Sequence, residues 1–400
     1  MPPRTPPSAR RLDAVLSPVI PRVAALQRQR PDALSLAQGM VSWGPPAAVA
    51  EAVAEAVAEG GTALDRYGPM AGDPALLERV RRELGERRGL DLTESDLLVT
   101  AGSNMAFHAV VQVLCDPGDE VLLPLPWYFN HAMAIQLAGG VAVPVAAGVI
   151  PDPEILAAAI GPRTRAIVTV SPNNPSGVVM PEAVLRAINA LCAERGLLHL
   201  SDEAYADFVF GPQAHYSPGS AAGSGAHTVS FFTLSKSHGM AGWRIGYAAA
   251  PKALREPLAK VQDTVLICPP RLTQRAAAAA LASGPTWVAE RVATLAPRRA
   301  QLLQALAPAQ AWGLMPLAAP EGAFYALVEA PWSGEEDRLL EHLVLGHGVA
   351  ALPGGSFGLP ARPDRVALRL GYGLLDLEEL EEALRRLVQA LKPGACSSGS

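Results

Sequence analysis

The stretch "SFFTLSKSHGMAGWRIG", residues 230–246, joins an apolar run to a glycine-rich turn and carries Lys236, one of only four lysines in the chain. The others are Lys252, Lys260 and Lys392, whereas arginine is used throughout. Arginine could supply a charge, but only a lysine amine can lose its proton and attack a carbonyl to form a Schiff base. Lys236 is therefore a candidate for covalent chemistry.

Short apolar runs alternate with longer amphipathic segments on both sides of this stretch. The runs do not alternate between apolar and polar residues, so they predict buried strands in a largely parallel sheet with helices on both faces. The fold class is therefore α/β. We expect seven strands, at 96–100, 120–125, 141–145, 166–170, 197–200, 228–234 and 244–250.

The 400 residues exceed what one small core organises, so two domains are expected. After about residue 285 the pattern changes to Arg/Ala/Leu-rich helices and short strands, which predicts a smaller α+β domain. We expect an N-terminal arm with part of the small domain at 1–44, a large domain at 45–285 and a small domain at 286–400. A helix over 286–306 would join the two domains.

The composition excludes several classes of protein. A net charge of −5 offers no basic field for nucleic acid, and the apolar stretches are interrupted well short of the roughly 20 residues that a membrane span needs. Four cysteines show neither a CxxC pair nor a pairing with histidine, which argues against a metal site or disulfides and indicates a cytoplasmic protein. The histidines are scattered, and His238 is the only one expected near Lys236.

Polar residues follow several predicted strands at their carboxyl ends, where ligands bind in sheets of this kind. Taken singly, each has an ordinary structural explanation: a helix cap, a turn, an ion pair or a surface lysine. They include "AGSNMAF" with Gly102, Ser103 and Asn104, "SPNNPSG" with Asn174, "SDEAYADF" with Asp202, and "TLSK" with Thr233, Ser235 and Lys236, followed by Arg244.

Together these residues predict one ligand. A helix start and an arginine suit a phosphate, a buried carboxylate suits a protonated ring nitrogen, and the lysine needs a carbonyl. Pyridoxal 5′-phosphate (PLP) has all three features. Electropositive surroundings would lower the pKa of the Lys236 amine, so that its neutral form is available near pH 7.

The motifs "SPNNPSG", "SDEAYADF", "TLSKSHGMAGWRIG" and "ALRLGYG" resemble those of class I/II aminotransferases of PLP fold type I. The resemblance extends from about residue 36 to residue 391. It implies a large domain with a mostly parallel seven-stranded sheet, a homodimer, and ping-pong transfer of an amino group between an amino acid and a 2-oxo acid.

The resemblance also implies roles for individual residues. Lys236 would form the Schiff base and shuttle a proton, and Asp202 would pair with the pyridine nitrogen. Tyr205 and Asn174 would hydrogen-bond the phenolic oxygen of the ring, and Tyr128 would stack on the ring, with Trp127 as the alternative. The phosphate would be held by Gly102, Ser103, Asn104, Thr233 or Ser235, and Arg244, with Tyr67 lent by the partner subunit.

For the substrate, the resemblance implies that Arg369 and Asn174 grip the α-carboxylate and that the backbone of Gly39 approaches it. Aspartate-type relatives tend to have a lysine where this chain has Asn104, so the cation for a second carboxylate is missing there. Arg271 could replace it, although a surface role is favoured. Trp43, with Met40, Val41, Val19 and Ile20, could line an apolar pocket, which favours neutral, aromatic or methionine-like amino acids.

Four alternatives remain open at this stage. A PLP-dependent β-lyase or an aspartate-type aminotransferase would keep most of the same residues. A serine hydrolase is suggested by "GGSFG" at 354–358, but prolines follow where the nucleophile elbow needs a helix. A transcription regulator would need a DNA-binding module before residue 36, where too few residues are present.

Overall fold

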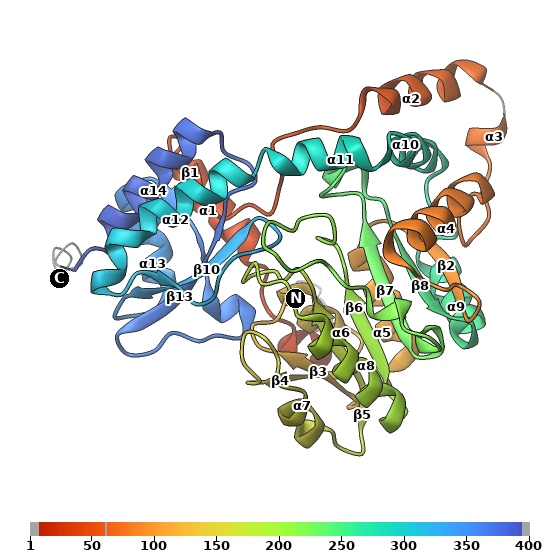
Figure 1. Ribbon diagram of the computed structural model, residues 1–400, viewed down its shortest axis with the longest axis horizontal. Helices are drawn as coiled ribbons and strands as arrows, with labels where there is room; N and C mark the ends of the chain where they lie inside the picture. Colours follow the sequence, from red (N-terminus) through yellow and green to blue (C-terminus); the bar gives the residue numbers. More distant parts are fainter. Residues whose placement is uncertain (1–7, 61, 394–400) are drawn as a thin grey trace, which may run out of the picture.

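The computed structural model describes residues 8–60 and 62–393. Within them a seven-stranded sheet has the order β2-β8-β7-β6-β5-β3-β4 (Figure 1). Strand β8 is antiparallel to both neighbours, and the pairs β7–β6, β6–β5, β5–β3 and β3–β4 are parallel. The predicted α/β class is confirmed. The strands are β2 (Ser95–Thr100), β3 (Glu120–Pro124), β4 (Val141–Val145), β5 (Thr164–Val170), β6 (Leu198–Asp202), β7 (Thr228–Thr233) and β8 (Gly246–Pro251).

Helices cover both faces of this sheet, which explains why its strands are apolar without alternation. In β3, Val121 and Leu123 belong to one buried cluster, together with Phe107. The intervening Leu122 belongs to another cluster, together with Ile188. The helices packed around the sheet are α2 (Ala47–Glu59), α4 (Pro74–Arg88), α5 (Ser103–Leu114), α6 (Phe129–Leu137), α7 (Pro153–Ala159), α8 (Glu182–Arg195), α9 (Arg255–Val265) and α10 (Arg271–Ala282).

A second, antiparallel sheet of order β12-β13-β10-β9 lies in the C-terminal part of the described chain. Its strands are β9 (Met315–Pro316), β10 (Tyr325–Pro331), β12 (Leu352–Pro353) and β13 (Arg365–Gly371). Strand β1 (Leu34–Ser35) pairs with β11 (Val349–Ala350), so residues near the N-terminus join this part. Its helices are α1 (Val19–Gln29), α13 (Glu336–Glu341) and α14 (Leu377–Leu391). The division at residues 44 and 285 stays a prediction.

The single helix expected over 286–306 is in fact two helices: α11 (Gly284–Ala293) spans the region between the two sheets, and α12 (Ala296–Leu306) lies over the C-terminal part beside α14 (Figure 1). Pro297 explains the break. Proline has no backbone N–H, and its ring collides with the carbonyl four residues earlier, here that of Ala293. The first helix therefore ends at Ala293.

The "GGSFG" segment does not form a nucleophile elbow. Gly354–Phe357 is a short 3₁₀ helix, and the carbonyl of Ser356 accepts a hydrogen bond from Trp127 Nε1 at 3.1 Å. A sharp strand-to-α-helix turn, which would present the serine hydroxyl, does not occur there. The serine-hydrolase alternative therefore has no structural support.

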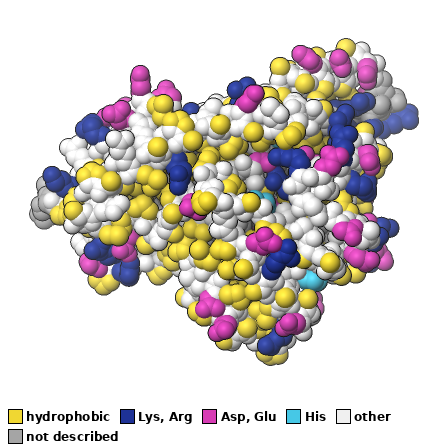
Figure 2. All heavy atoms as spheres, in the orientation of Figure 1, with side chains coloured by type: hydrophobic (Ala, Val, Ile, Leu, Met, Phe, Trp, Pro, Cys, Tyr) yellow, Lys and Arg dark blue, Asp and Glu magenta, His cyan; other side chains and the backbone are white. Residues whose placement is uncertain are grey.

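The surface and the described helices add two observations. Acidic and basic side chains are interspersed on the face shown in Figure 2. Among the described helices, none has both the length and the hydrophobicity that a membrane span requires.

Candidate active site

The polar residues predicted at strand ends meet in one cavity of about 540 Å³, counting its open mouth, which we call the inner cavity. A second space, the outer cavity, adjoins it and shares Tyr128, Asn174, Tyr205 and Lys236 with it. The inner cavity is lined by Ser103, Asn104, Tyr128, Val170, Asn174, Asp202, Ala204, Tyr205, Thr233, Ser235, Lys236, Ala241 and Arg244. The outer cavity adds Gly39, Tyr325 and Arg369, among others.

One end of the inner cavity is suited to an anion. Helix α5 begins there at Ser103, and the first N–H groups of a helix have no partner within it. Gly102 precedes the helix with φ +85°, and a Cβ on Gly102 would collide with the Arg244 guanidinium. Nη1 of Arg244 donates to Ala241 O at 3.0 Å and lies 3.5 Å from Ser235 Oγ.

Arg244 was expected as the first residue of the strand at 244–250, and this expectation is wrong. It has φ +49°, in the left-handed region, and β8 begins two residues later. The turn before β8 places the guanidinium beside Gly102 rather than along the strand. The helix start, the hydroxyls and the guanidinium together form an anion cradle of the kind that suits a phosphate.

At the centre of the site, Asp202 lies at the end of β6 and is buried. It accepts a hydrogen bond from Ala204 N at 3.0 Å, and His131 Nε2 lies 3.0 Å from its Oδ2. His131 comes from α6 and stacks on Phe107 with ring centroids 4.1 Å apart. The carboxylate is therefore held in place, while Asp202 still lines the inner cavity.

His131 was missed by the sequence analysis, which expected only His238 near the site. His238 instead stacks on Trp287 and lines neither cavity, and burial lowers its pKa to about 4. The available signal was spacing, because His131 follows Tyr128 by three residues and residues three apart share a helix face.

Lys236 lies between the two cavities, and its Nζ donates to the carbonyl of Gly39 at 2.5 Å. The pKa of its amine is lowered to about 8, mainly by burial and in addition by the positive charges of Arg369 and Arg244, while Asp202 opposes the shift. The expected direction is therefore found, but burial is the larger cause. A substantial fraction of the amine is neutral near pH 8.

Arg369 on β13 is buried and faces the outer cavity. Nη1 donates to Asn174 Oδ1 at 2.9 Å, and Nη2 donates to Ala37 O at 2.6 Å. Its guanidinium carbon lies 4.5 Å from the ring centroid of Tyr325, and Nε has no hydrogen-bond partner among the described residues. A buried guanidinium without a carboxylate partner is suited to binding an anionic group of a ligand.

Two tyrosines link the cavities. The hydroxyls of Tyr205 and Tyr325 lie 2.9 Å apart, and both side chains are buried. Lys236 Nζ lies 6.0 Å from the ring centroid of Tyr205. Tyr325, on β10, is the second site residue that the sequence analysis missed. It stands in an apolar run, "GAFYALVEA", that predicted only a strand.

The outer cavity also has apolar lining residues, among them Val19, Ile20, Met40 and Phe129. Two residues expected there lie elsewhere. Val41 is buried in the core, and Trp43 packs beside Phe208 and donates from Nε1 to Ser237 O at 3.3 Å. Both follow Met40, where the chain turns away into the core.

Two further predicted residues lie outside both cavities of this chain. Tyr67 is 78% exposed, and Arg271 forms an ion pair with Asp73 at 3.4 Å. Within a single chain, Tyr67 therefore does not meet the other phosphate-binding candidates.

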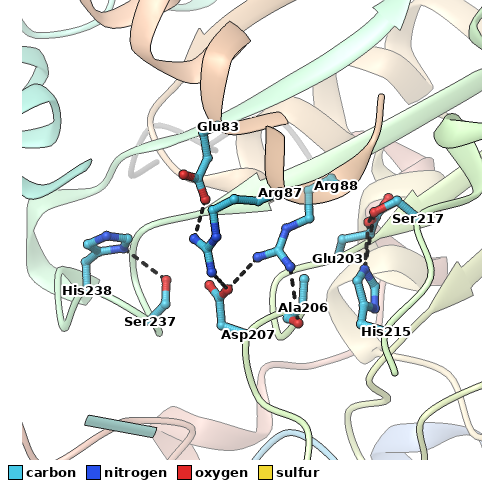
Figure 3. A network of polar contacts seen from close by, with 10 residues as sticks. All are labelled: Glu83, Arg87, Arg88, Glu203, Ala206, Asp207, His215, Ser217, Ser237 and His238. Carbon is cyan, nitrogen blue, oxygen red and sulfur yellow. Dashed lines mark hydrogen bonds and ion pairs between the residues drawn. The ribbon is translucent and has the colours of Figure 1, made fainter. Parts of the chain in front are cut away.

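The segment that follows Asp202 is anchored by buried ion pairs (Figure 3). Asp207 accepts hydrogen bonds from Arg87 at 2.7 Å and Arg88 at 2.5 Å, both at the end of α4. Burial opposes the charged carboxylate, but the two guanidinium groups outweigh it and hold the pKa of Asp207 below its ordinary value. Next to Asp202, Glu203 pairs with His215 at 2.9 Å and also accepts from Ser217.

The sheet brings a lysine, a carboxylate and an anion cradle together at its strand ends, an arrangement suited to a ligand with a carbonyl and a phosphate. Comparisons identify the family. The family model "Aminotransferase class I and II" matches residues 31–387. The chain belongs to the class I and II aminotransferases, whose members depend on PLP.

Individual relatives support the same conclusion. The chain is 34% identical to the aromatic aminotransferase ISS1 of Arabidopsis thaliana over 94% of each protein. It is 36% identical to a probable aspartate/prephenate aminotransferase of Thermus aquaticus, over 93% of this chain and 94% of the relative. A solved structure of aspartate aminotransferase from Thermus thermophilus with maleate aligns with a TM-score of 0.86 and 34% identity, over 97% of this chain and all of that one. The protein is therefore an aminotransferase.

Proposed function

We propose that this chain binds PLP in its inner cavity and moves an amino group between a neutral, aromatic or methionine-like L-amino acid and a 2-oxo acid. The observation that carries the proposal is the meeting of Lys236, Asp202 and the Gly102–Arg244 anion cradle in one cavity. These groups match a carbonyl, a ring nitrogen and a phosphate.

The residues present fit this cofactor. Ser103, Ser235 and Arg244 would hold the phosphate, with Asn104 and Thr233 beside them, and the lack of a Cβ at Gly102 leaves the room that Arg244 needs. Asp202 would face the ring nitrogen. Tyr128, Tyr205 and Asn174 would contact the ring and its phenolic oxygen.

When bound, PLP supplies the electron sink that stabilises negative charge on the substrate Cα. Arg369 and Asn174 would hold the α-carboxylate of the amino acid, and the Gly39 carbonyl would orient the Lys236 amine, which it already contacts. Because its pKa is near 8, this amine can accept the proton from the substrate Cα when it is free. Transfer to a second 2-oxo acid by the reverse steps gives a ping-pong mechanism.

The substrate proposal rests on the outer cavity. Val19, Ile20 and Met40 are among its lining residues. Its only cationic lining residues within the described chain are Lys236 and Arg369. Lys236 is assigned to the cofactor and Arg369 to the α-carboxylate, so a second carboxylate on the substrate side chain would lack a cationic partner. The relatives include aromatic, aspartate/prephenate and arginine–pyruvate aminotransferases, and therefore do not select a substrate side chain.

We also propose a homodimer in which Tyr67 contributes to the partner's phosphate site. Tyr67 belongs to an exposed apolar area, since Val265 and Ile267 are 57% and 43% exposed. Residues 67–68 and 267–268 adjoin, because the backbone N of Gly68 donates to Cys268 Sγ at 3.3 Å.

A cytoplasmic location is proposed because the described cysteines, Cys115, Cys192 and Cys268, are all free. Cys396 lies outside the described residues.

The test is spectroscopic. PLP is added to the purified protein, and then single amino acids, including methionine, phenylalanine, leucine and aspartate. We expect a visible band that an amino acid removes and a 2-oxo acid restores, fastest with the apolar amino acids. Lys236→Ala should abolish the band, whereas Lys252→Ala should not. Preference for aspartate would overturn the substrate proposal, and no band in the folded protein would overturn PLP binding. Release of ammonia and pyruvate from S-methylcysteine, which has a thiolate leaving group on Cβ, would indicate a β-lyase.

A further inference from the structure

Either hydroxyl could donate the hydrogen bond between Tyr205 and Tyr325, and the proposed function determines which one does. A phenol has one hydrogen to donate and an oxygen that can accept. If Tyr205 donates its hydrogen to the cofactor, it has none left for Tyr325, 2.9 Å away. Tyr325 must then be the donor and Tyr205 the acceptor.

The surroundings of Tyr325 hold its hydroxyl in place. The residue lies on β10, in register with Gly371 of β13, and its side chain is fully buried. The Arg369 guanidinium lies over its ring at 4.5 Å. A Cβ on Gly39 would come within 2.7 Å of the Tyr325 oxygen, so the backbone at Gly39 closes the space beside the hydroxyl.

We propose that Tyr325 is a positioning residue that fixes Tyr205 as a hydrogen-bond donor into the inner cavity. This inference rests on the proposed function, because it needs a bound acceptor for Tyr205. Through its ring, the same residue contacts Arg369, which we assign to the substrate carboxylate. Tyr325 therefore connects the cofactor side of the site with the substrate side.

The consequence is measurable as a shift in titration. A hydroxyl that accepts a hydrogen bond becomes a stronger donor, because hydrogen bonds in a chain polarise one another. A stronger donation from Tyr205 favours the deprotonated, more negative form of the bound chromophore. Removal of the Tyr325 hydroxyl should therefore raise the pH midpoint of the visible absorbance band.

The experiment titrates the visible band of the PLP-loaded protein with pH. Tyr325→Phe should raise the midpoint by about half a pH unit. The KM for the amino acid should stay within about twofold, because the phenyl ring still lies under Arg369. In a Tyr205→Phe background, Tyr325→Phe should cause no further shift.

Tyr372→Phe is the matched control, because Tyr372 is also fully buried and its hydroxyl has no partner among the described residues. It should leave the midpoint unchanged. Should Tyr325→Phe not fold, Gly39→Ala provides a second route, since its Cβ would push the Tyr325 hydroxyl aside and raise the midpoint.

Two results would overturn the inference: an unchanged midpoint in Tyr325→Phe, or a shift that persists without the Tyr205 hydroxyl. These are distinct from failure of the proposed function, for which the unsubstituted protein would show no visible band at all.

Discussion

Nε2 of His131 lies 3.0 Å from Oδ2 of Asp202, and both side chains are buried. Ala204 N donates to the other carboxylate oxygen, so loss of the imidazole would leave Oδ2 buried without this donor, at a cost of about 1–3 kcal/mol. His131→Leu should therefore lower the free energy of unfolding of the cofactor-free protein by about 1–3 kcal/mol, measured by urea denaturation. His131→Gln, which keeps an N–H donor, should recover part of this loss, and equal stability of all three proteins would contradict the assigned contact.

A second prediction concerns Gly102, whose φ of +85° and proximity to Arg244 leave no room for a side chain. Gly102→Ala should weaken PLP binding at least about tenfold through backbone strain and displacement of the guanidinium. Binding of pyridoxal, which has no phosphate, should change little. The control is Gly85→Ala, since Gly85 lies within α4 with nothing within 4 Å of its missing Cβ. An equal loss of both ligands in Gly102→Ala would argue against an anion cradle.

The pH dependence of stability should reveal Lys236. Its pKa is about 8 in the folded protein, whereas an ordinary lysine has a pKa of 10.5, so between these pH values the unfolded chain holds a proton that the folded chain lacks. Stability of the cofactor-free protein therefore rises with pH in this window, by roughly 2–3 kcal/mol from this group. Lys236→Met should remove that rise and be more stable than the parent at pH 7. Lys260→Met, at an exposed position, should show the parental profile.

A packing test follows from the 2.7 Å separation between a Cβ on Gly39 and the Tyr325 oxygen. Gly39→Ala alone should raise the KM for the amino acid, because the clash displaces Tyr325 from under Arg369. In a Tyr325→Phe background the next ring atom is 3.7 Å away, an ordinary contact, so the same substitution should cost much less. Equal costs in the two backgrounds would mean that the backbone at Gly39 moves instead.

Every strand of the large sheet could be predicted from the sequence, because buried parallel strands are short apolar runs that polar turns delimit. The strand-end positions of Asp202 and of the helix start at Ser103 followed from the same pattern. Periodicity did not reveal local breaks. The left-handed conformation of Arg244 and the end of α11 before Pro297 both interrupt segments whose composition continues unchanged.

Site residues that do not stand at the ends of strands in the large sheet were harder to predict. His131 and Tyr325 lie in a helix and a strand whose sequences satisfy ordinary packing; only the spacing of His131 from Tyr128 was a local signal, and Tyr325 had none. Their contacts depend on how two sheets and α6 meet. Trp43 illustrates the reverse error, since an aromatic residue close to Gly39 in sequence was expected in the pocket but packs beside Phe208 in the core.

The hydrogen bond from Arg369 Nη2 to Ala37 O joins residues 332 positions apart. Contacts of such long sequence separation form late, because the entropy of closing the loop must be overcome before they stabilise the chain. During refolding, the sheet and its helices can assemble before the N-terminal segment reaches β13. Recovery of far-ultraviolet circular dichroism should therefore precede recovery of the visible cofactor band, and the competent site should be the last property of the molecule to return.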